Sequence, residues 1–332
     1  MTAHPTAPFP AGTRRGLDAC ASTGGRFTVL ALDHRQNLRR EIDPAHPEAV
    51  STEAMVELKR AVVRALAPVA SGVLLDPEVG AAQCIADGSL PGKAGLIIAI
   101  EATGYEGSTT ERCSRVLEGW SVRKAKRMGA SAAKLLLYYH PAAANAAEQE
   151  ALVAHVAADC RAEDLALFVE PLTYSVDPAV PKLAGEARRI AVIETARRLS
   201  SIGGDVLKVE FPYDASVTDE SRWVEACAEL DAATPLPWVL LSGGVDDATF
   251  ERQVEAACRA GASGVLAGRS VWAEAAGLEG EARDEFLRGD GVTRLARLVE
   301  IVERLGRPWT DRASHLRDAS PGPDWYRAYG ER

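Results

Sequence analysis

The chain has 332 residues, 47% of them hydrophobic and 26% charged, with a formal net charge of −9 at pH 7. This composition is that of a soluble globular protein, and the length fits one α/β barrel of about 250 residues with insertions. The acidic balance argues against nucleic acid or an anionic membrane as the main partner, and no apolar run is long enough to span a membrane.

Eight short apolar runs recur along the chain, and several of them end in a carboxylate. Continuous apolar runs are typical of parallel strands that are covered on both faces. The predicted strands are residues 27–33, 72–77, 95–101, 132–138, 165–170, 206–211, 238–242 and 264–267.

Helical periodicity or capping residues mark the segments between these runs. Ser51 is a predicted N-cap, and Gly129 is a predicted helix end after a basic last turn. The predicted helices are residues 51–69, 111–128, 145–160, 185–200, 218–230, 246–260 and 292–305. Eight strands alternating with helices predict a single (β/α)8 barrel, because a doubly wound sheet would show an early G-x-G-x-x-G turn, which this chain lacks.

The expected barrel domain covers residues 16–310. Residues 1–15 are expected to form a flexible N-terminal segment, and residues 311–332 a polar C-terminal tail. The N-terminal segment has no apolar core of the kind found in signal peptides, and the six cysteines lie far apart in sequence. Both observations favour reduced thiols and a cytoplasmic protein.

Lys208 stands in the middle of the sixth predicted strand, where the pattern calls for an apolar residue. Burying an ammonium group costs several kcal/mol unless the group is paired or loses its proton. One interpretation is an amine with a lowered pKa that attacks a carbonyl carbon and forms a Schiff base. The other is a structural ion pair with Asp205 or Glu210.

Lys134, Glu170 and Lys208 lie on the fourth, fifth and sixth predicted strands. Neighbouring strands are about 4.8 Å apart, so the three side chains can converge at the carboxyl-terminal mouth of a barrel, where active sites of this fold lie. A second cation beside Lys208 would lower its pKa, and Glu170 could carry protons. Glu170 could also serve only as an ion-pair partner. Asp76 and Glu101 could equally be solvated charges on the rim.

Glycines and an arginine follow the last two predicted strands. Ser242, Gly243 and Gly244 come after the seventh strand, and Gly268 and Arg269 come after the eighth. Loops at these two positions commonly bind phosphate in this fold, because backbone N–H groups and a guanidinium group converge there. The six histidines show no metal-binding spacing, so neither a metal nor a cofactor is predicted.

Ordered motifs extend the pattern over residues 26–310. They are Ala31-Leu32-Asp33-His34-Arg35, Leu74-Leu75-Asp76-Pro77-Glu78, Glu101-Ala102-Thr103-Gly104-Tyr105, Lys134-Leu135-Leu136-Leu137-Tyr138-Tyr139, Glu170-Pro171-Leu172-Thr173-Tyr174, Leu207-Lys208-Val209-Glu210, Leu241-Ser242-Gly243-Gly244-Val245 and Gly268-Arg269. In this order they resemble the tagatose-1,6-bisphosphate aldolase family, which also contains sulfofructose-phosphate aldolases.

The resemblance implies a class I, metal-independent aldolase acting on a phosphorylated sugar. Lys208 would match the Schiff-base lysine, Glu170 the acid/base residue and Lys134 the second lysine of the site. Asp33 would contact substrate hydroxyls. The expected phosphate-binding residues are Ser242, Gly243, Gly244, Gly268 and Arg269.

One motif departs from the family. His34 and Arg35 follow Asp33 where the family commonly has Gln-Arg-Gly, so these two residues are expected to contact the substrate at an end whose chemistry stays open. That end could carry a phosphate, a sulfonate or another polar group. A sugar-phosphate isomerase without an imine and a ligand sensor on the same barrel are the alternative functions. Self-association into a homo-oligomer is possible for a barrel of this kind.

Overall fold

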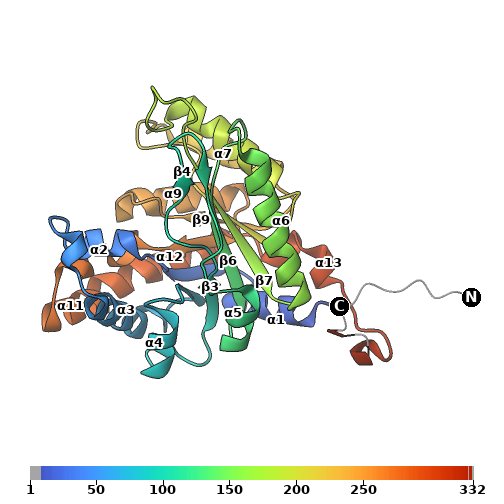
Figure 1. The fold of residues 1–332 in the computed structure, drawn as a ribbon, viewed down its shortest axis with the longest axis horizontal. Coiled ribbons are helices and arrows are strands. Elements are labelled where there is room, and N and C mark those ends of the chain that lie inside the picture. The colour runs from blue at the N-terminus through green and yellow to red at the C-terminus, as the bar shows by residue number, and fades with distance from the viewer. Residues whose placement is uncertain (1–8, 328, 331–332) are drawn as a thin grey trace, which may run out of the picture.

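A closed barrel of eight parallel strands forms the centre of the computed structural model, which describes residues 9–327 and 329–330 (Figure 1). The order around the barrel is β1-β10-β9-β8-β7-β6-β3-β2. The strands are β1 (Phe27–Leu32), β2 (Gly72–Leu75), β3 (Gly95–Ala99), β6 (Ala132–Tyr139), β7 (Ala166–Thr173), β8 (Val206–Val209), β9 (Trp238–Leu241) and β10 (Gly264–Ala267). The predicted (β/α)8 fold and all eight predicted strands are confirmed.

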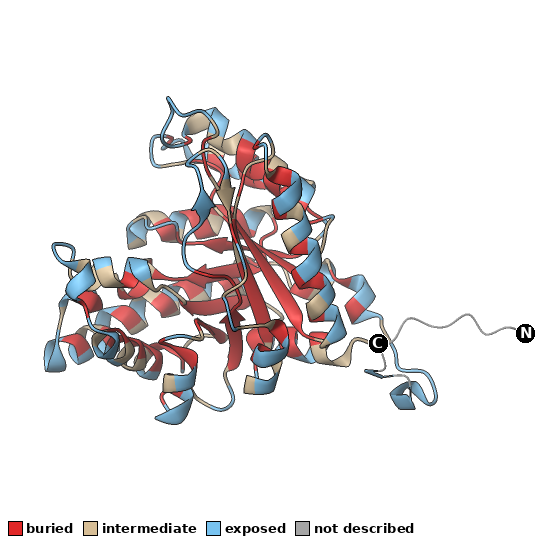
Figure 2. Cartoon of the chain, viewed as in Figure 1, coloured by how far each residue is buried: buried red, intermediate tan, exposed pale blue. Residues whose placement is uncertain are grey.

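The strands are apolar because both of their faces are buried, as Figure 2 shows for the centre of the molecule. Inward-facing residues such as Phe27, Phe168 and Leu266 fill the interior, and helix α1 (Ala11–Cys20) contributes Leu17 to the same cluster. The barrel is therefore a packed core rather than a pore.

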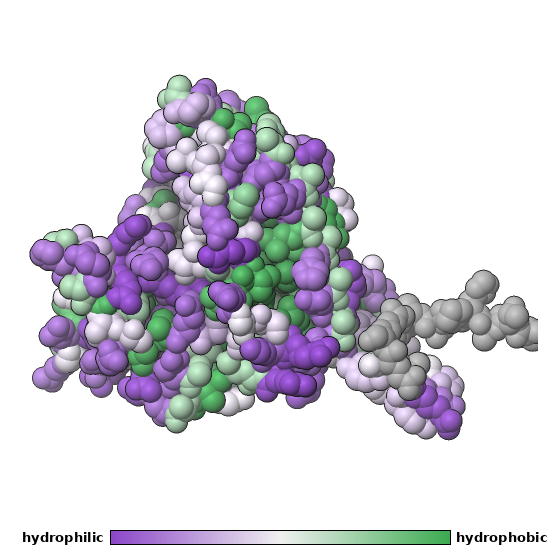
Figure 3. Space-filling view, viewed as in Figure 1, coloured by the Kyte–Doolittle hydropathy of each residue, from purple (hydrophilic) through white to green (hydrophobic). Residues whose placement is uncertain are grey.

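Helices form the outer layer around the strands. The longer ones are α3 (Thr52–Leu66), α6 (Ala146–Ala162), α7 (Gly185–Leu199), α8 (Glu220–Ala233), α9 (Asp247–Ala260) and α12 (Val292–Leu305). The shorter ones are α2 (Gln36–Ile42), α4 (Ala81–Ala86), α5 (Val122–Met128), α10 (Arg269–Trp272), α11 (Gly280–Phe286) and α13 (Ser314–Arg317). The side chain of Ser51 accepts a backbone N–H group as the predicted N-cap of α3, and the side chain of Asp246 caps α9 in the same way. Hydrophilic residues dominate the surface in Figure 3, apart from an apolar area over β6 and α6.

The prediction of one helix over residues 111–128 is wrong in its first half. That part of the chain contains β5 (Arg112–Cys113), which pairs antiparallel with the preceding β4 (Glu106–Gly107), and α5 begins only at Val122. Gly119 has a positive φ of 73°, which interrupts a helix, and the side chain of Ser121 caps the new N-terminus. The predicted end at Gly129 is confirmed, with the glycine in the left-handed conformation.

Both ends of the expected barrel domain continue into helical segments. Helix α1 starts at Ala11, where the backbone N–H groups of Gly12 and Thr13 donate to the Asp164 carboxylate. Helix α13 buries Leu316. Residues 1–8 of the expected flexible segment lie outside the described residues, so the domain limits stay a prediction.

Two findings bear on the environment of the chain. Among the described residues, no helix is both long and apolar enough to cross a membrane. All six cysteines lie in that part of the chain as free thiols, and five of them are buried.

A buried ion pair ties α3 to the first two strands. Lys59 on α3 pairs with Asp76, which follows β2, and both side chains are completely buried. The Lys59 ammonium also donates to the carbonyl oxygen of Leu32 at 2.9 Å, and the Asp76 carboxylate accepts the backbone N–H groups of Glu78 and Val79. Asp76 is thus not a solvated rim charge. The pair fixes the end of β1, from which Asp33 and His34 project.

We expect Lys59→Met to destabilise the fold by about 3–5 kcal/mol, because it leaves the Asp76 carboxylate buried without a counter-ion. Lys59→Met/Asp76→Asn should recover part of that loss, since the amide is neutral and still accepts hydrogen bonds. Urea denaturation measures both changes. Arg64→Met, at an exposed ion pair on α3, is the control and should change stability by less than about 1 kcal/mol. Equal losses in the single and double variants would contradict the argument.

Candidate active site

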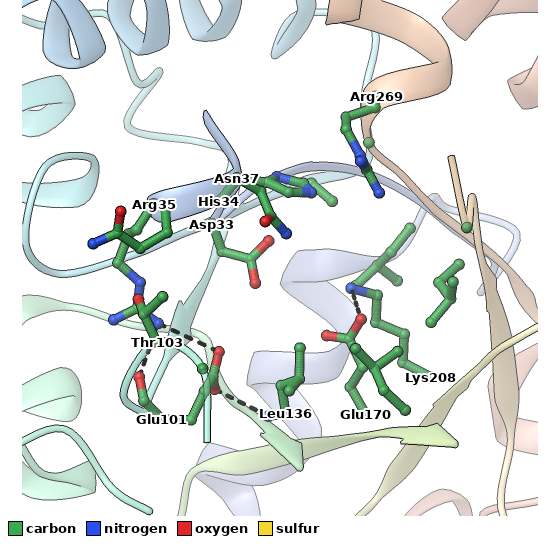
Figure 4. Close-up of a pocket in the computed structure, with 18 of the residues that line it drawn as sticks. Asp33, His34, Arg35, Asn37, Glu101, Thr103, Leu136, Glu170, Lys208 and Arg269 are labelled. Carbon is green, nitrogen blue, oxygen red and sulfur yellow. Dashed lines mark hydrogen bonds and ion pairs between the residues drawn. The ribbon is translucent and has the colours of Figure 1, made fainter. Parts of the chain in front are cut away.

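A cavity of about 680 Å³ opens at the carboxyl-terminal ends of the strands (Figure 4). Nine of the eleven residues predicted to form the site line it: Asp33, His34, Arg35, Glu170, Lys208, Ser242, Gly243, Gly268 and Arg269. Lys134 lies directly beneath it and is completely buried. Gly244 instead borders a smaller neighbouring cavity, which shares Arg269 with the large one. The structure therefore brings together residues that are far apart in sequence.

The lysine and carboxylate side chains of β6, β7 and β8 meet at the floor of the cavity. Lys208 Nζ lies 2.7 Å from Glu170 Oε1, and Lys134 Nζ lies 2.9 Å from Glu170 Oε2. The predicted convergence of the three residues is thus present, with Glu170 between the two amines. Glu170 is in position to exchange a proton with the Lys208 amine.

Lys134 is surrounded by three carboxylates. Besides Glu170, its ammonium contacts Asp33 Oδ2 and Glu101 Oε1, each at 2.7 Å. Burial alone would lower the pKa of Lys134, but these carboxylates hold the pKa well above its usual value. Burial alone would likewise raise the pKa of Asp33, but the charges of Lys134 and Lys208 hold it well below its usual range. Lys134 therefore stays charged and Asp33 stays ionised at neutral pH.

Lys208 contacts neither Asp205 nor Glu210, the two carboxylates that were possible partners in a purely structural ion pair. Glu210 pairs with Arg188 at 3.1 Å and accepts from Thr173, while Asp205 accepts the backbone N–H of Leu167 at 2.8 Å. Lys208 is left with Glu170 as its only carboxylate partner among the described residues. The interpretation of Lys208 as one arm of an ion pair with Asp205 or Glu210 is therefore wrong.

Glu101 belongs to the same charged cluster, although the sequence alone did not decide whether it is a site residue or a solvated charge on the rim. It is 3% exposed, so it is not a solvated rim charge. One carboxylate oxygen binds Lys134, and the other accepts the backbone N–H of Leu136 at 3.0 Å. Its position at the end of the third apolar run is the sequence signal that marked it as a candidate, but nothing in the sequence names Lys134 as its partner.

The loops after β9 and β10 form the opposite side of the cavity. Gly243 and Gly244 have φ values of 60° and 77°, a conformation that glycine adopts without strain. A Cβ atom on Gly244 would lie 3.2 Å from the Arg269 guanidinium, so a glycine lets the arginine pack closely against this loop. Arg269 also pairs with Glu41 of α2 at 3.1 Å. A guanidinium group and the backbone N–H groups of glycine residues are suited to bind a phosphate here.

His34 and Arg35 occupy different parts of the cavity wall. The His34 ring packs edge-on against Trp272, with centroids 5.3 Å apart, and its buried Nδ1 has no hydrogen-bond partner among the described residues. Arg35 donates to Glu78 at 2.6 Å and to the carbonyl oxygen of Glu101 at 2.9 Å. Two of the guanidinium donors of Arg35 are thus already used by the protein.

Other lining residues were not predicted from the sequence. They are contributed mainly by α2, by the loop after β3 and by the upper ends of β6 and β7, and include Asn37, Arg40, Thr103, Tyr105, Leu136, Tyr138 and Leu172. Tyr138 could have been found, because it lies four residues after Lys134 on the same face of a strand. Among the described residues no group of three metal-binding side chains is present, and the metal-free site stays a prediction.

Comparisons with known proteins agree on one family. Residues 27–274 match the family model described as DeoC/LacD family aldolase. Tagatose 1,6-diphosphate aldolase 2 of Streptococcus pyogenes serotype M1 is 33% identical over 314 residues, which cover 88% of this chain and 95% of that protein. Tagatose 1,6-diphosphate aldolase of Lactococcus lactis subsp. lactis is 33% identical over 321 residues, with 90% and 98% covered.

Solved structures share the fold. An archaeal fructose 1,6-bisphosphate aldolase superposes with a TM-score of 0.59 at 21% identity, covering 88% of this chain and 99% of that chain. At this level of identity the likeness concerns the barrel architecture.

We expect His34 to make the protein sensitive to mild acid. Burial lowers the pKa of His34 from 6.5 to about 3. The negative charge of Asp33 opposes this shift, and the positive charges of Arg269 and Lys208 add to it. Between these two pH values the unfolded chain binds a proton that the folded chain does not, so stability falls as the pH drops through this window. At pH 5 the loss should be roughly 1–2 kcal/mol relative to pH 7.

Urea denaturation of the wild type and of His34→Gln at the two pH values measures this loss. Between pH 7 and pH 5, the variant should lose roughly 1–2 kcal/mol less stability than the wild type loses. His46→Gln, which removes an imidazole that is 71% exposed, is the control and should behave like the wild type. An unchanged pH dependence in His34→Gln would show that His34 is not responsible.

Proposed function

Because the chain belongs to the DeoC/LacD family of aldolases, we propose that it is a class I aldolase that cleaves a phosphorylated ketose reversibly to dihydroxyacetone phosphate and an aldehyde. The observation that carries the proposal is the position of Lys208. This lysine lies at the cavity floor with Glu170 at 2.7 Å, facing a glycine and arginine cluster suited to phosphate.

Lys208 is the proposed nucleophile. Its amine attacks the ketone carbon, and loss of water leaves an iminium ion. The iminium accepts the electron pair of the carbon–carbon bond when that bond breaks, and forms an enamine. Protonation of the enamine carbon and hydrolysis of the imine then release dihydroxyacetone phosphate and return the free amine.

Glu170 is the proposed proton carrier. Cleavage removes a proton from the hydroxyl group on the carbon that becomes the aldehyde, and imine formation needs protons moved at the former carbonyl oxygen. The Glu170 carboxylate lies beside Lys208 and is buried. Lys134 is proposed to hold Glu170 in place and, with Asp33, to form a fixed polar floor against the substrate hydroxyls.

The phosphate of the ketone half is proposed to bind Ser242, Gly243, Gly244, Gly268 and Arg269. Tagatose 1,6-bisphosphate is the favoured substrate, supported by the two relatives named for this activity that are 33% identical over most of their length. The alternative substrate is a related ketose phosphate, including a sulfofructose phosphate. Such substrates differ at the distal end, which is proposed to lie near His34 and Arg35. The proposed location is the cytoplasm, with which the free thiols are consistent. Self-association into a homo-oligomer is proposed as well.

We expect Lys208→Ala and Lys208→Arg to lose activity by on the order of 10³-fold or more, because neither side chain can form the imine. The arginine variant is the matched control that keeps a positive charge. Borohydride added with dihydroxyacetone phosphate should inactivate the wild type, and mass spectrometry should locate the adduct on the peptide that carries Lys208.

Treatment with EDTA should leave the activity unchanged, because no step of the proposed reaction uses a metal ion. Full activity of Lys208→Ala would overturn the proposal, as would loss of activity with EDTA. An isomerase that uses Glu170 as a base would turn over sugar phosphate without forming an adduct. A ligand sensor would bind the sugar phosphate without turnover.

A further inference from the structure

Two strands rise above the others at the mouth of the barrel. β6 and β7 are eight residues long, whereas β8, β9 and β10 have four residues each (Figure 1). The pair stays in register to its end, with Leu136 opposite Glu170 and Tyr138 opposite Leu172. The upper ends of β6 and β7 therefore form a wall beside the cavity, one layer above the proposed proton carrier.

Tyr138 faces the cavity from this wall. It lies on the same face of β6 as Lys134 and Leu136, and it lines the cavity with Leu136 and Leu172. Leu136 and Tyr138 are partly exposed, whereas the alternating residues Leu137 and Tyr139 are buried beneath the outer layer. Only the inward-facing residues of the wall can thus reach a substrate.

The Tyr138 ring is held in one orientation by its neighbours. Tyr105 packs against it edge-on with centroids 5.0 Å apart, and the Arg112 guanidinium lies 5.4 Å from its centroid. Arg112 is itself held between Tyr105 and Tyr174, each at 4.7 Å. Such cation–π contacts are favourable and fix the position of a ring. Arg112 is thus a positioning residue that does not itself line the cavity.

The hydroxyl group of Tyr138 is available for a ligand. Within residues 9–327 and 329–330, no side chain or backbone group makes a hydrogen bond with it, although its backbone N–H donates to Ser114. Burial raises the pKa of Tyr138, opposed by the charge of Arg112, so the phenol stays protonated and can donate at neutral pH. By contrast, the Tyr139 hydroxyl on the outer face donates to Glu150.

We propose that Tyr138 determines specificity for the aldehyde half of the substrate, by donating a hydrogen bond to a hydroxyl group on that half. The ketone half lies between Lys208 and the Arg269 loop in the proposed function, on which this inference rests. Strand β6, which carries Tyr138, lies on the other side of β7 from β8, so Tyr138 borders the part of the substrate that leaves as the aldehyde. Besides Tyr138 and Glu170, the residues of β6 and β7 that line the cavity are Leu136, level with Glu170, and Leu172, level with Tyr138, and neither apolar side chain can donate a hydrogen bond.

The test is aldol addition of dihydroxyacetone phosphate to two aldehydes of equal length, glyceraldehyde and propanal. Propanal lacks the hydroxyl groups. Tyr138→Phe should lower kcat/KM for glyceraldehyde by about tenfold, the effect of one hydrogen bond between neutral groups, and should leave kcat/KM for propanal within about twofold. Borohydride trapping of dihydroxyacetone phosphate, which involves only the ketone half, should proceed at the wild-type rate in this variant.

Two further variants separate a direct contact from a structural effect. Tyr139→Phe removes a hydroxyl group from the outer face of the same strand and should match the wild type with both aldehydes. Arg112→Leu should lower kcat/KM for glyceraldehyde alone, and adding Tyr138→Phe to it should cause no loss beyond that of Tyr138→Phe by itself.

Equal kcat/KM values for the wild type and Tyr138→Phe with glyceraldehyde would overturn the inference. So would an equal loss with both aldehydes, or slower trapping, since either result indicates a structural role. A wild-type protein that traps no dihydroxyacetone phosphate contradicts the proposed function and the inference together. If the wild type and Tyr138→Phe both trap dihydroxyacetone phosphate and prefer glyceraldehyde over propanal to the same extent, the inference alone is contradicted.

Discussion

The charge of Lys134 is the constraint on which the site depends. A completely buried ammonium group is stable only where carboxylates surround it, and Asp33, Glu101 and Glu170 supply three of them. Asp33 and Glu101 follow the ends of β1 and β3, and Glu170 lies within β7, so the Lys134 ammonium on β6 fixes the relative positions of four strands. The same contacts hold Glu170 against Lys208, which means that the stability of the barrel mouth and its chemistry rest on one cluster.

Much of this arrangement could be predicted from the sequence, because burial on both faces makes barrel strands continuous apolar runs. Lys134, Glu170 and Lys208 interrupt such runs, and strand order alone placed them side by side. The hairpin of residues 106–113 was missed because its strands are only two residues long and carry no apolar alternation. Asp76 was undecided because its partner, Lys59, lies on a helix 17 residues away, and no local pattern indicates that pairing.

The missed hairpin is also the part of the structure that shapes the far side of the cavity. Arg112 belongs to β5, and its stacking on three tyrosines brings together the loop after β3 and the upper ends of β6 and β7. The residues proposed to bind the phosphate occur in loops with a recognisable glycine pattern. Tyr138, proposed to discriminate between aldehydes, lies near the end of β6, on a wall that exists because β6 and β7 are longer than the other strands. Where a strand ends is the feature that is hardest to predict from a sequence.

The pairing of β1 with β10 has a consequence for synthesis of the chain. Phe27 lies opposite Gly264, so the barrel is closed by the first and the last of its eight strands to be synthesised. Until residue 267 has emerged, β1 has an unpaired edge of the kind that promotes association between nascent chains. A chain truncated before β10 would keep Lys134 and its three carboxylates but could not close the sheet, and such fragments are natural targets for chaperones and proteases.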